Sequence, residues 1–283
     1  MMYPRAEVSA KRIEEVFNLD PIIKNKPADS DFDEKVSIEF DHVTFVYPDG
    51  EEPVLQDVSF KANKGEMIAF IGSTGSGKST LVNLVPRFYD VSSGSIKING
   101  KDIRDYDVLE LRDKLGVIPQ KAVLFSGTIA DNIRFGKKDA SDEEVEYAAK
   151  VAQAYPFIME KENGFDEEIS EGATNFSGGQ KQRLSIARAL VRKAQIYIFD
   201  DSFSALDFKT DAILRKELKK EMTESIMLVV AQRISSIMEA DQIIVLNEGK
   251  VVGKGTHHQL LKECQIYHEI ATSQLSEEEL ANA

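Results

Sequence analysis

The sequence contains a single cysteine, Cys264, so no disulfide can form within the chain. Such sparse cysteine usage is typical of proteins in a reducing compartment such as the cytosol. No apolar run approaches the about 20 residues that a membrane-spanning helix requires, and no signal peptide is recognisable. If a membrane matters to this protein, we therefore expect the connection to pass through a partner or through a segment missing from the sequence.

Basic residues are scarce relative to acidic ones: 35 lysines and arginines face 48 aspartates and glutamates, which gives a net charge of -13. This acidity argues against non-specific nucleic-acid binding, which depends on a basic surface. Hydrophobic residues make up 42% of the 283 residues, enough for a sizeable core and too many for a disordered chain. The length allows one large domain or two small ones.

The most informative segment is a glycine-rich loop between a predicted strand, residues 67–71, and the start of a predicted helix, residues 81–85. In this context the pattern G-x-x-x-x-G-K-[ST] predicts a phosphate-binding loop. Glycines let backbone N–H groups surround a triphosphate, Lys78 adds a positive charge, and Ser79 offers a hydroxyl to Mg²⁺. A glycine-rich turn with an unrelated lysine is the alternative. The loop consists of Gly72, Ser73, Thr74, Gly75, Ser76, Gly77, Lys78, Ser79 and Thr80.

Alternation of apolar and polar residues predicts strands at residues 36–40, 43–47 and 54–60, before the loop. These segments indicate an antiparallel sheet that leads into a parallel, phosphate-binding core. Residues 139–164 have helical periodicity instead, which predicts a helical insert between two halves of the sheet.

Two later strands are predicted to end in polar residues. The apolar run 196–199 precedes Asp200 and Asp201, and the run 225–231 precedes Gln232. Continuous apolar runs are typical of strands covered on both faces. Because ligands of open α/β sheets bind beyond the carboxyl ends of the strands, we expect these three polar residues in the site.

A third signal is the Ser-Gly-Gly-Gln segment, residues 177–180, before a predicted helix over residues 181–191. Ser177 is well placed as the N-cap, and the two glycines permit close backbone approach. The helix start is therefore a candidate second anion site, with an ordinary Ser-Gly cap as the alternative.

In this order and spacing, the loop 72–80, the segment 177–180 and the acidic strand end at Asp200, followed by residues 204–207, resemble the ATP-binding cassette (ABC) family. Each motif is weak to moderate alone, and the combination is specific. The resemblance covers residues 36–262. It implies an α/β fold: a P-loop NTPase (RecA-like) core with an antiparallel β subdomain and an inserted α-helical subdomain.

Residues 123–133 resemble the segment that follows the glutamine loop of exporter-type cassettes. Transmembrane helices precede the cassette in such exporters, so residues 1–35 correspond to the end of a transmembrane helix and its linker. From the residues alone, a frayed extension explains them equally well. The resemblance places the helical insert at about residues 121–180, and we expect residues 263–283 to form a helical tail.

The resemblance implies that this chain binds ATP and Mg²⁺. Tyr47 corresponds to the aromatic residue that stacks on adenine, although a core tyrosine at a strand end is the alternative. The implied Mg²⁺ ligands are Ser79, Gln120 and Asp200. The residues expected to contact the nucleotide are Tyr47, Val54, Ser73, Thr74, Gly75, Ser76, Gly77, Lys78, Ser79, Thr80 and Gln120. The residues expected to act in hydrolysis are Lys78, Gln120, Asp201 and Gln232.

A second cassette is the implied partner. Ser177, Gly179 and Gln180 correspond to residues that grip the ATP held by that cassette. Asp207 corresponds to a contact with the partner's loop, which places it near the shared nucleotide. Residues 155–158 lie where an exporter's own transmembrane domain would dock, with the core of the insert as an equal alternative.

Two positions depart from the family's pattern, and both concern hydrolysis. Asp201 stands where these ATPases usually carry a glutamate that orients the attacking water. Aspartate and glutamate have nearly the same acidity, but aspartate is shorter by one carbon–carbon bond, about 1.5 Å. Gln232 stands where a histidine is expected, and glutamine neither becomes cationic near neutral pH nor shuttles a proton.

These departures predict a site that binds MgATP firmly and hydrolyses it slowly. The Ser-Gly-Gly-Gln signature is intact, although Phe176 replaces the usual leucine before it. We therefore expect the degenerate-site half of a heterodimeric exporter of small hydrophobic compounds, at the cytoplasmic face of the cell membrane. A homodimeric exporter cassette with slow turnover and a soluble nucleotide-sensing module are the alternatives.

Overall fold

A computed structural model of the chain describes residues 3–18, 23–27 and 36–276. The helices are α1 (Tyr3–Phe17), α2 (Lys78–Leu84), α3 (Val108–Asp113), α4 (Ile129–Arg134), α5 (Asp142–Val151), α6 (Tyr155–Met159), α7 (Gly178–Leu190), α8 (Phe208–Glu221), α9 (His257–Glu263) and α10 (Gln265–Gln274). The strands are β1 (Ser37–Phe45), β2 (Leu55–Asn63), β3 (Met67–Gly72), β4 (Ser93–Ile98), β5 (Lys101–Asp102), β6 (Leu115–Ile118), β7 (Gly127–Thr128), β8 (Glu168–Ile169), β9 (Ile196–Asp200), β10 (Ile226–Val230), β11 (Gln242–Asn247) and β12 (Lys250–Gly255). The short 3-10 helices η1 to η4 are Ile103–Asp105, Gly164–Asp166, Glu171–Ala173 and Ile234–Ser236.

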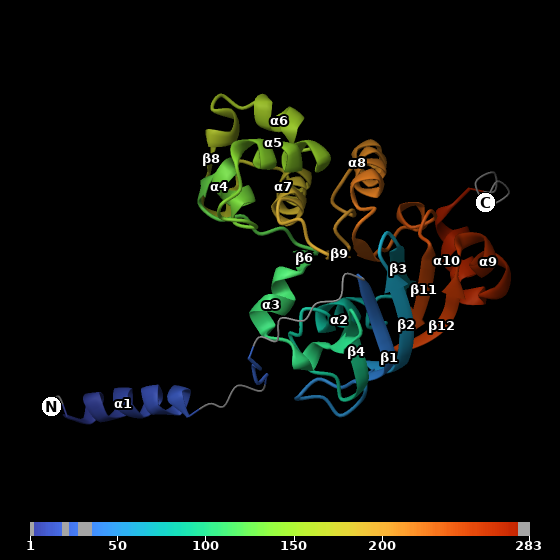
Figure 1. The fold of residues 1–283 in the computed structure, drawn as a ribbon, viewed down its shortest axis with the longest axis horizontal. Helices are drawn as coiled ribbons and strands as arrows, with labels where there is room; N and C mark the ends of the chain where they lie inside the picture. Colours follow the sequence, from blue (N-terminus) through green and yellow to red (C-terminus); the bar gives the residue numbers. More distant parts are fainter. Residues whose placement is uncertain (1–2, 19–22, 28–35, 277–283) are drawn as a thin grey trace.

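The central sheet has 6 strands in the order β12-β11-β3-β10-β9-β6, and only the β11–β12 pair is antiparallel. Every residue of β10 is buried, as expected for a strand covered on both faces. Because β3, β10 and β9 are neighbours and parallel, their carboxyl ends meet at one edge of the sheet (Figure 1). This edge brings together the glycine-rich loop, Asp200 and the segment that contains Gln232.

A second, antiparallel sheet of 4 strands has the order β2-β1-β4-β5. The expectation of separate strands at 36–40 and 43–47 is wrong, because β1 is continuous from Ser37 to Phe45. The pairing of β1 with β2 shifts between Phe40 and Val43, where His42 has a positive φ of 50°. At this bulge the alternation of buried and exposed residues shifts by one position. The shift made the sequence of one strand resemble that of two.

Helices α4 to α7 form a separate lobe between β6 and β9 (Figure 1). The helical pattern over residues 139–164 corresponds to α5 and α6, which a short break separates. Ser141 caps α5 by accepting a hydrogen bond from the Glu144 N–H, and the Glu144 carboxylate accepts one from the Ser141 N–H. The predicted fold is confirmed: a P-loop core, an antiparallel β subdomain and a helical insert.

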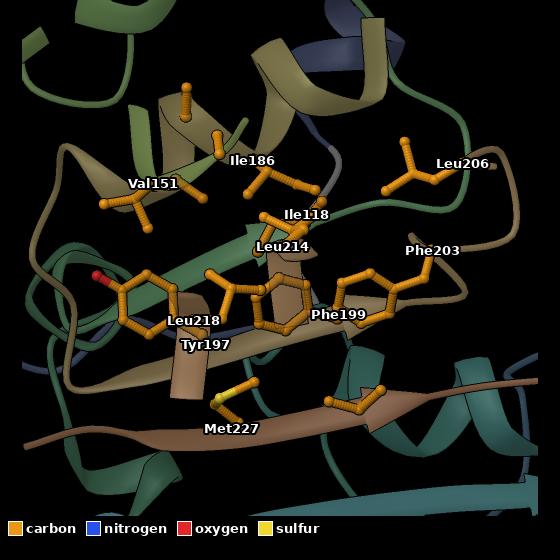
Figure 2. Close-up of a cluster of buried hydrophobic side chains, with 14 of the residues drawn as sticks. Ile118, Val151, Ile186, Tyr197, Phe199, Phe203, Leu206, Leu214, Leu218 and Met227 are labelled. Atoms are coloured by element: carbon orange, nitrogen blue, oxygen red, sulfur yellow. The ribbon is translucent and has the colours of Figure 1, made fainter. Parts of the chain in front are cut away.

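Buried apolar side chains cover both faces of the central sheet. Figure 2 shows part of the cluster that joins the sheet to the insert and to α8, including Ile186, Phe199 and Leu214. Phe199 stacks on Phe203 with ring centroids 5.2 Å apart, and both side chains are buried. Because these two rings flank Asp200 and Asp201 in the chain, the core fixes the backbone that carries the acidic pair.

The two ends of the described chain differ in packing. Helix α10 packs on α9, where the buried Tyr267 hydroxyl lies 2.6 Å from Nδ1 of His257. Helix α1 projects away from the body (Figure 1), and its apolar residues Ile13, Val16 and Phe17 are exposed. Within the described residues, no helix has the length and apolar character needed to cross a membrane. Most of the predicted linker, residues 19–22 and 28–35, and the end of the predicted tail, residues 277–283, lie outside the described residues.

Candidate nucleotide-binding site

The glycine-rich loop joins β3 to α2 along a path that two of its glycines make possible. A Cβ atom at Gly72 would lie 2.0 Å from the carbonyl oxygen of Leu246. Gly77 has a φ of 97°, and a Cβ atom there would lie 2.9 Å from the carbonyl oxygen of Val54. Only glycine fits both positions. The backbone of Val54 therefore packs against the loop, close to the residues predicted to bind phosphate.

Lys78 is the first residue of α2, and its ammonium group lies against the loop. Nζ donates hydrogen bonds to the carbonyl oxygens of Gly72 at 2.9 Å and Ser73 at 2.7 Å, and to Oγ of Ser76 at 3.2 Å. Burial lowers the pKa of Lys78, and the two nearby carboxylates at the end of β9 oppose this effect. The loop thus holds a partly desolvated cation at its centre.

Ser79 and Asp200, two of the predicted Mg²⁺ ligands, meet in the fold. Oγ of Ser79 donates a hydrogen bond of 2.8 Å to Oδ1 of Asp200. Burial raises the pKa of Asp200, and the hydrogen bond from Ser79 opposes the rise. Among the described residues, no group of three or more His, Cys, Asp or Glu side chains could hold a metal ion by itself. One hydroxyl and one carboxylate fit Mg²⁺, which usually takes few protein ligands and fills its shell with water and phosphate oxygens.

Asp201 is buried and accepts two side-chain hydrogen bonds at a single oxygen. Nε2 of Gln120 donates to Oδ2 at 3.0 Å, and Nε2 of Gln232 donates to the same atom at 2.7 Å. Burial raises the pKa of Asp201, and the hydrogen bond from Gln120 opposes this. The structure therefore places the predicted Mg²⁺ ligand Gln120 on Asp201 and does not show it bonded to Ser79 or Asp200. Three of the four residues predicted to act in hydrolysis, Gln120, Asp201 and Gln232, thus form one contact group.

Tyr47 lies two residues beyond the end of β1 and contacts α2. Its hydroxyl lies 2.9 Å from Oγ1 of Thr80, which connects it to the glycine-rich loop. The ring packs edge-on against Phe45 and Tyr89, with centroids 4.8 and 5.2 Å apart. Tyr47 is only partly buried. A partly exposed, firmly packed ring beside the glycine-rich loop is able to stack on a flat base.

The Ser-Gly-Gly-Gln signature stands at the start of α7, with Ser177 at the N-cap. Oγ of Ser177 accepts a hydrogen bond from the Gln180 N–H at 3.3 Å, and the Gln180 side chain accepts one from the Ser177 N–H at 2.9 Å. Ser177 and Gly178 are exposed, and a Cβ atom at Gly178 would meet nothing within 4 Å. In the described chain, no hydrogen bond or ion pair joins residues 177–180 to residues 72–80. The two candidate anion sites therefore share no hydrogen bond or ion pair within the described residues.

The segment after Asp201 carries contacts that the sequence did not reveal. Oγ of Ser204 donates to the carbonyl oxygen of Asp201 at 2.8 Å, and the Arg233 guanidinium donates to the carbonyl of Ser204 at 3.2 Å. Asp207 caps α8 at the end of this segment. Its carboxylate accepts a hydrogen bond from the Thr210 N–H, and this bond lowers the pKa of Asp207. Arg233, the residue after Gln232, therefore contacts the backbone of the segment between Asp201 and Asp207. Bonds to backbone carbonyls leave no residue pattern by which they could have been found.

Comparison with known proteins fits this arrangement. A family model described as "ABC transporter" matches residues 55–204. The chain belongs to the ABC transporter family. An uncharacterized ABC transporter ATP-binding protein of Mycobacterium tuberculosis is 44% identical over 276 residues, which cover 96% of this chain and 47% of that protein. A putative multidrug export ATP-binding/permease protein of Staphylococcus aureus is 44% identical over 84% of this chain and 41% of its own length.

A solved structure of a bacterial Atm1-family ABC exporter with ATP bound is also similar, with a TM-score of 0.91 and 34% identity. The alignment covers 97% of this chain and 48% of that chain. The chain thus spans about half the length of the ABC proteins that it matches. The resemblance drawn from its motifs is confirmed at the level of the family.

The segment 155–158 of this ABC chain belongs largely to the core of the insert. Phe157 and Ile158 are buried, and Phe157 packs edge-on against Phe176 with centroids 6.4 Å apart. Arg183 lies over the Phe157 ring at 4.7 Å. The sequence left two interpretations of this segment, a docking surface for a transmembrane domain and the core of the insert. The second accounts for the burial of Phe157 and Ile158. Phe176, which replaces a leucine before the signature, is part of the same packing.

Proposed function

We propose that this chain binds MgATP at residues 72–80 and works as one ATP-binding cassette of an exporter. The loop fits phosphate groups, because its path requires glycine and Lys78 is held at its centre. Ser79 and Asp200 would hold Mg²⁺ with hard oxygen atoms. When bound, the ion supplies positive charge that neutralises the phosphate oxygens. Tyr47 would stack on the adenine.

The chain's own site is proposed to hydrolyse ATP slowly. The observation that carries this proposal is the double hydrogen bond of Gln120 and Gln232 to Oδ2 of Asp201. Two amide donors hold a short carboxylate back at the end of β9, so that its reach toward an attacking water is limited. Misplacement of a catalytic group by 1 Å costs about 100-fold in rate. Gln232 also cannot carry the positive charge that a histidine offers.

The signature would complete a site on a second cassette, which we propose to be a different chain. The separation of Ser177 from the loop, and its exposure, support a contact with the ATP of a partner. Binding of two MgATP molecules between the cassettes would favour the closed pair. The difference in affinity between open and closed pairs then drives the transport cycle.

Residues 1–35 would connect this cassette to its own transmembrane domain, with the cassette at the cytoplasmic face of the membrane. The exposed apolar residues of α1, Ile13, Val16 and Phe17, support a helix that continues toward such a domain. The membrane-spanning helices would then precede this helix in the same polypeptide. The similarity to the S. aureus relative, a putative multidrug export ATP-binding/permease protein, supports small hydrophobic compounds as cargo.

The test compares nucleotide binding with phosphate release by the purified chain. We expect the chain to bind a fluorescent ATP analogue with Mg²⁺, and Lys78→Ala to weaken binding at least about tenfold, because charge-assisted hydrogen bonds are lost. Lys61→Ala, which removes an exposed lysine of β2, serves as the control. Failure of the chain to retain MgATP would contradict the whole proposal.

Mixing experiments test the asymmetry. Phosphate release should be slow for the chain alone and rise when a second cassette with glutamate and histidine at the two altered positions is added. Trapped nucleotide should then be ADP in one site and ATP in the other. Brisk release by the chain alone, little reduced by Gln232→Ala, would contradict the slow site. ATP retained in every site would favour a sensing module.

A further inference from the structure

The cleft beside the glycine-rich loop has a second wall that none of the sequence motifs includes. The cleft encloses about 620 Å³, and its lining contains the loop together with Gln120, Asp201 and Gln232. Helix α10 forms the other wall with Ile266, Ile270 and Gln274. The last helix of the described chain therefore faces the same space as the residues predicted to act in hydrolysis.

Gln274, the last residue of α10, contacts the segment that carries Gln232. Its Nε2 donates a hydrogen bond of 2.8 Å to the backbone carbonyl of Gln232. Its Oε1 accepts one of 2.8 Å from the backbone N–H of Ile234. One side-chain amide thus bonds to the carbonyl before Arg233 and to the N–H after it, as the backbone of a neighbouring parallel strand would.

The bond to Ile234 has a structural reason. Ile234 begins the short helix η4 and is fully buried, and Arg233 at the N-cap position offers no side-chain cap. The first N–H groups of a helix lack partners within the helix, and leaving one unpaired in a buried place is costly. Gln274 supplies the acceptor from 40 residues away in the sequence.

Helix α10 gives Gln274 a fixed base. Tyr267 and Ala271 are fully buried, and the Tyr267 hydroxyl lies 2.6 Å from Nδ1 of His257 in α9. The N–H of Leu275 bonds to the carbonyl of Ala271 and closes the last turn of the helix. Since α10 is anchored on one face, the amide at its end holds residues 232–234 at a defined distance from the sheet.

We propose that Gln274 is a positioning residue for Gln232, through which α10 sets the place of the Gln232 amide relative to Asp201. The chain of contacts is short: Gln274 holds the Gln232 backbone, and the Gln232 side chain bonds to Oδ2 of Asp201. A shift of residues 232–234 moves the amide that restrains the carboxylate. The effect on turnover rests on the proposed function, whereas the restraint of residues 232–234 does not.

The restraint is tested by residue-resolved hydrogen exchange of the nucleotide-free chain. Gln274→Ala should speed exchange of the Ile234 amide about five- to tenfold, because one hydrogen bond is lost. Gln274→Glu keeps an acceptor for this N–H and should retain most of its protection. Gln265→Ala is the matched control, because Gln265 is the same residue type on the same helix and bonds only to Glu269. Unchanged Ile234 exchange in Gln274→Ala would overturn the proposal.

The effect on the site is tested by a double-mutant cycle with Gln232→Ala. At saturating MgATP, Gln274→Ala should raise kcat about tenfold and change KM less than about twofold, because the amide that holds the Asp201 carboxylate back is displaced. In the Gln232→Ala background, Gln274→Ala should cause no further change. Equal changes of kcat in both backgrounds would show a merely structural role and overturn the proposal. If neither the unchanged chain nor the variants bind MgATP, the proposed function is wrong. The hydrogen-exchange experiment then decides by itself whether Gln274 restrains residues 232–234.

Discussion

The side-chain amide of Gln232 donates a hydrogen bond of 2.7 Å to Oδ2 of Asp201. These are the two positions at which the sequence predicts a departure from the ABC pattern that concerns hydrolysis, and they are 31 residues apart in the sequence. Because the two side chains touch, the departures form one altered contact. Changes at such a pair are expected to be coupled and not additive.

The first prediction concerns restoration of this pair. Asp201→Glu combined with Gln232→His should raise phosphate release by the chain's own site by about 100-fold, because the carboxylate gains reach and a titratable partner. Each single change should give much less. Release is measured with the chain mixed with a second cassette whose own site is inactive. Asp139→Glu, in an exposed turn before α5, is the control and should have little effect. An unchanged rate in the double variant, with MgATP affinity intact, would contradict this prediction.

The second prediction separates the signature from an ordinary helix cap. Ser177 and Ser141 each cap a helix through the same reciprocal pair of hydrogen bonds. Ser177→Ala and Ser141→Ala should each lower the free energy of unfolding by about 1 kcal/mol, measured by urea titration. Only Ser177→Ala should reduce hydrolysis by the partner cassette in a mixture. Equal effects of both variants on the partner would count against a role for Ser177 beyond capping.

The third prediction concerns Tyr47. Tyr47→Leu should weaken MgATP binding about tenfold, because stacking of a base on an aromatic ring contributes about 1–3 kcal/mol. Tyr47→Phe keeps the ring and loses only the hydroxyl contact with Thr80, so its affinity should stay within about threefold of the original. Titration of both variants with a fluorescent ATP analogue provides the measurement. Equal affinities of the two variants would mean that the ring only fills the core.

The fourth prediction follows from the raised pKa of Asp200, whose main cause is burial. A carboxyl whose pKa is higher in the folded chain than in the unfolded chain favours folding when it is protonated. That contribution is complete below the ordinary pKa of 3.8 and is lost as the pH rises through the raised pKa of the folded state. Asp200→Asn cannot ionise, so it should raise the Tm at pH 7 without nucleotide and Mg²⁺, and the gain should shrink toward acidic pH.

The control for this prediction is Asp207→Asn. The pKa of Asp207 is lowered by the hydrogen bond from the Thr210 N–H, so loss of its charge should not raise the Tm at pH 7. Thermal unfolding followed by circular dichroism at several pH values gives the comparison. A Tm of Asp200→Asn that stays at or below that of the unchanged chain at pH 7 would contradict the argument.

The local sequence pattern was sufficient to predict those features whose structure depends on residues that are close together in the chain. The glycine-rich loop, the N-cap at Ser177 and the apolar strand before Asp200 depend on backbone conformation and burial within a few residues. Their spacing therefore predicted the parallel core and the family. The same reasoning wrongly predicted two strands where β1 is continuous. The cause is the bulge near His42, because an extra residue in one strand shifts the apolar–polar alternation without ending the strand.

By itself the sequence determined which residue types stand at the loop, at the signature and at the two altered positions, since these are properties of the chain alone. Only the tertiary structure decided that Gln120 and Gln232 both bond to Asp201, and that Gln274 reaches the backbone of residues 232–234. The physical reason is that hydrogen bonds between distant segments depend on how strands and helices pack. The sequence around a glutamine does not indicate which distant residue its side-chain amide will contact in the folded chain.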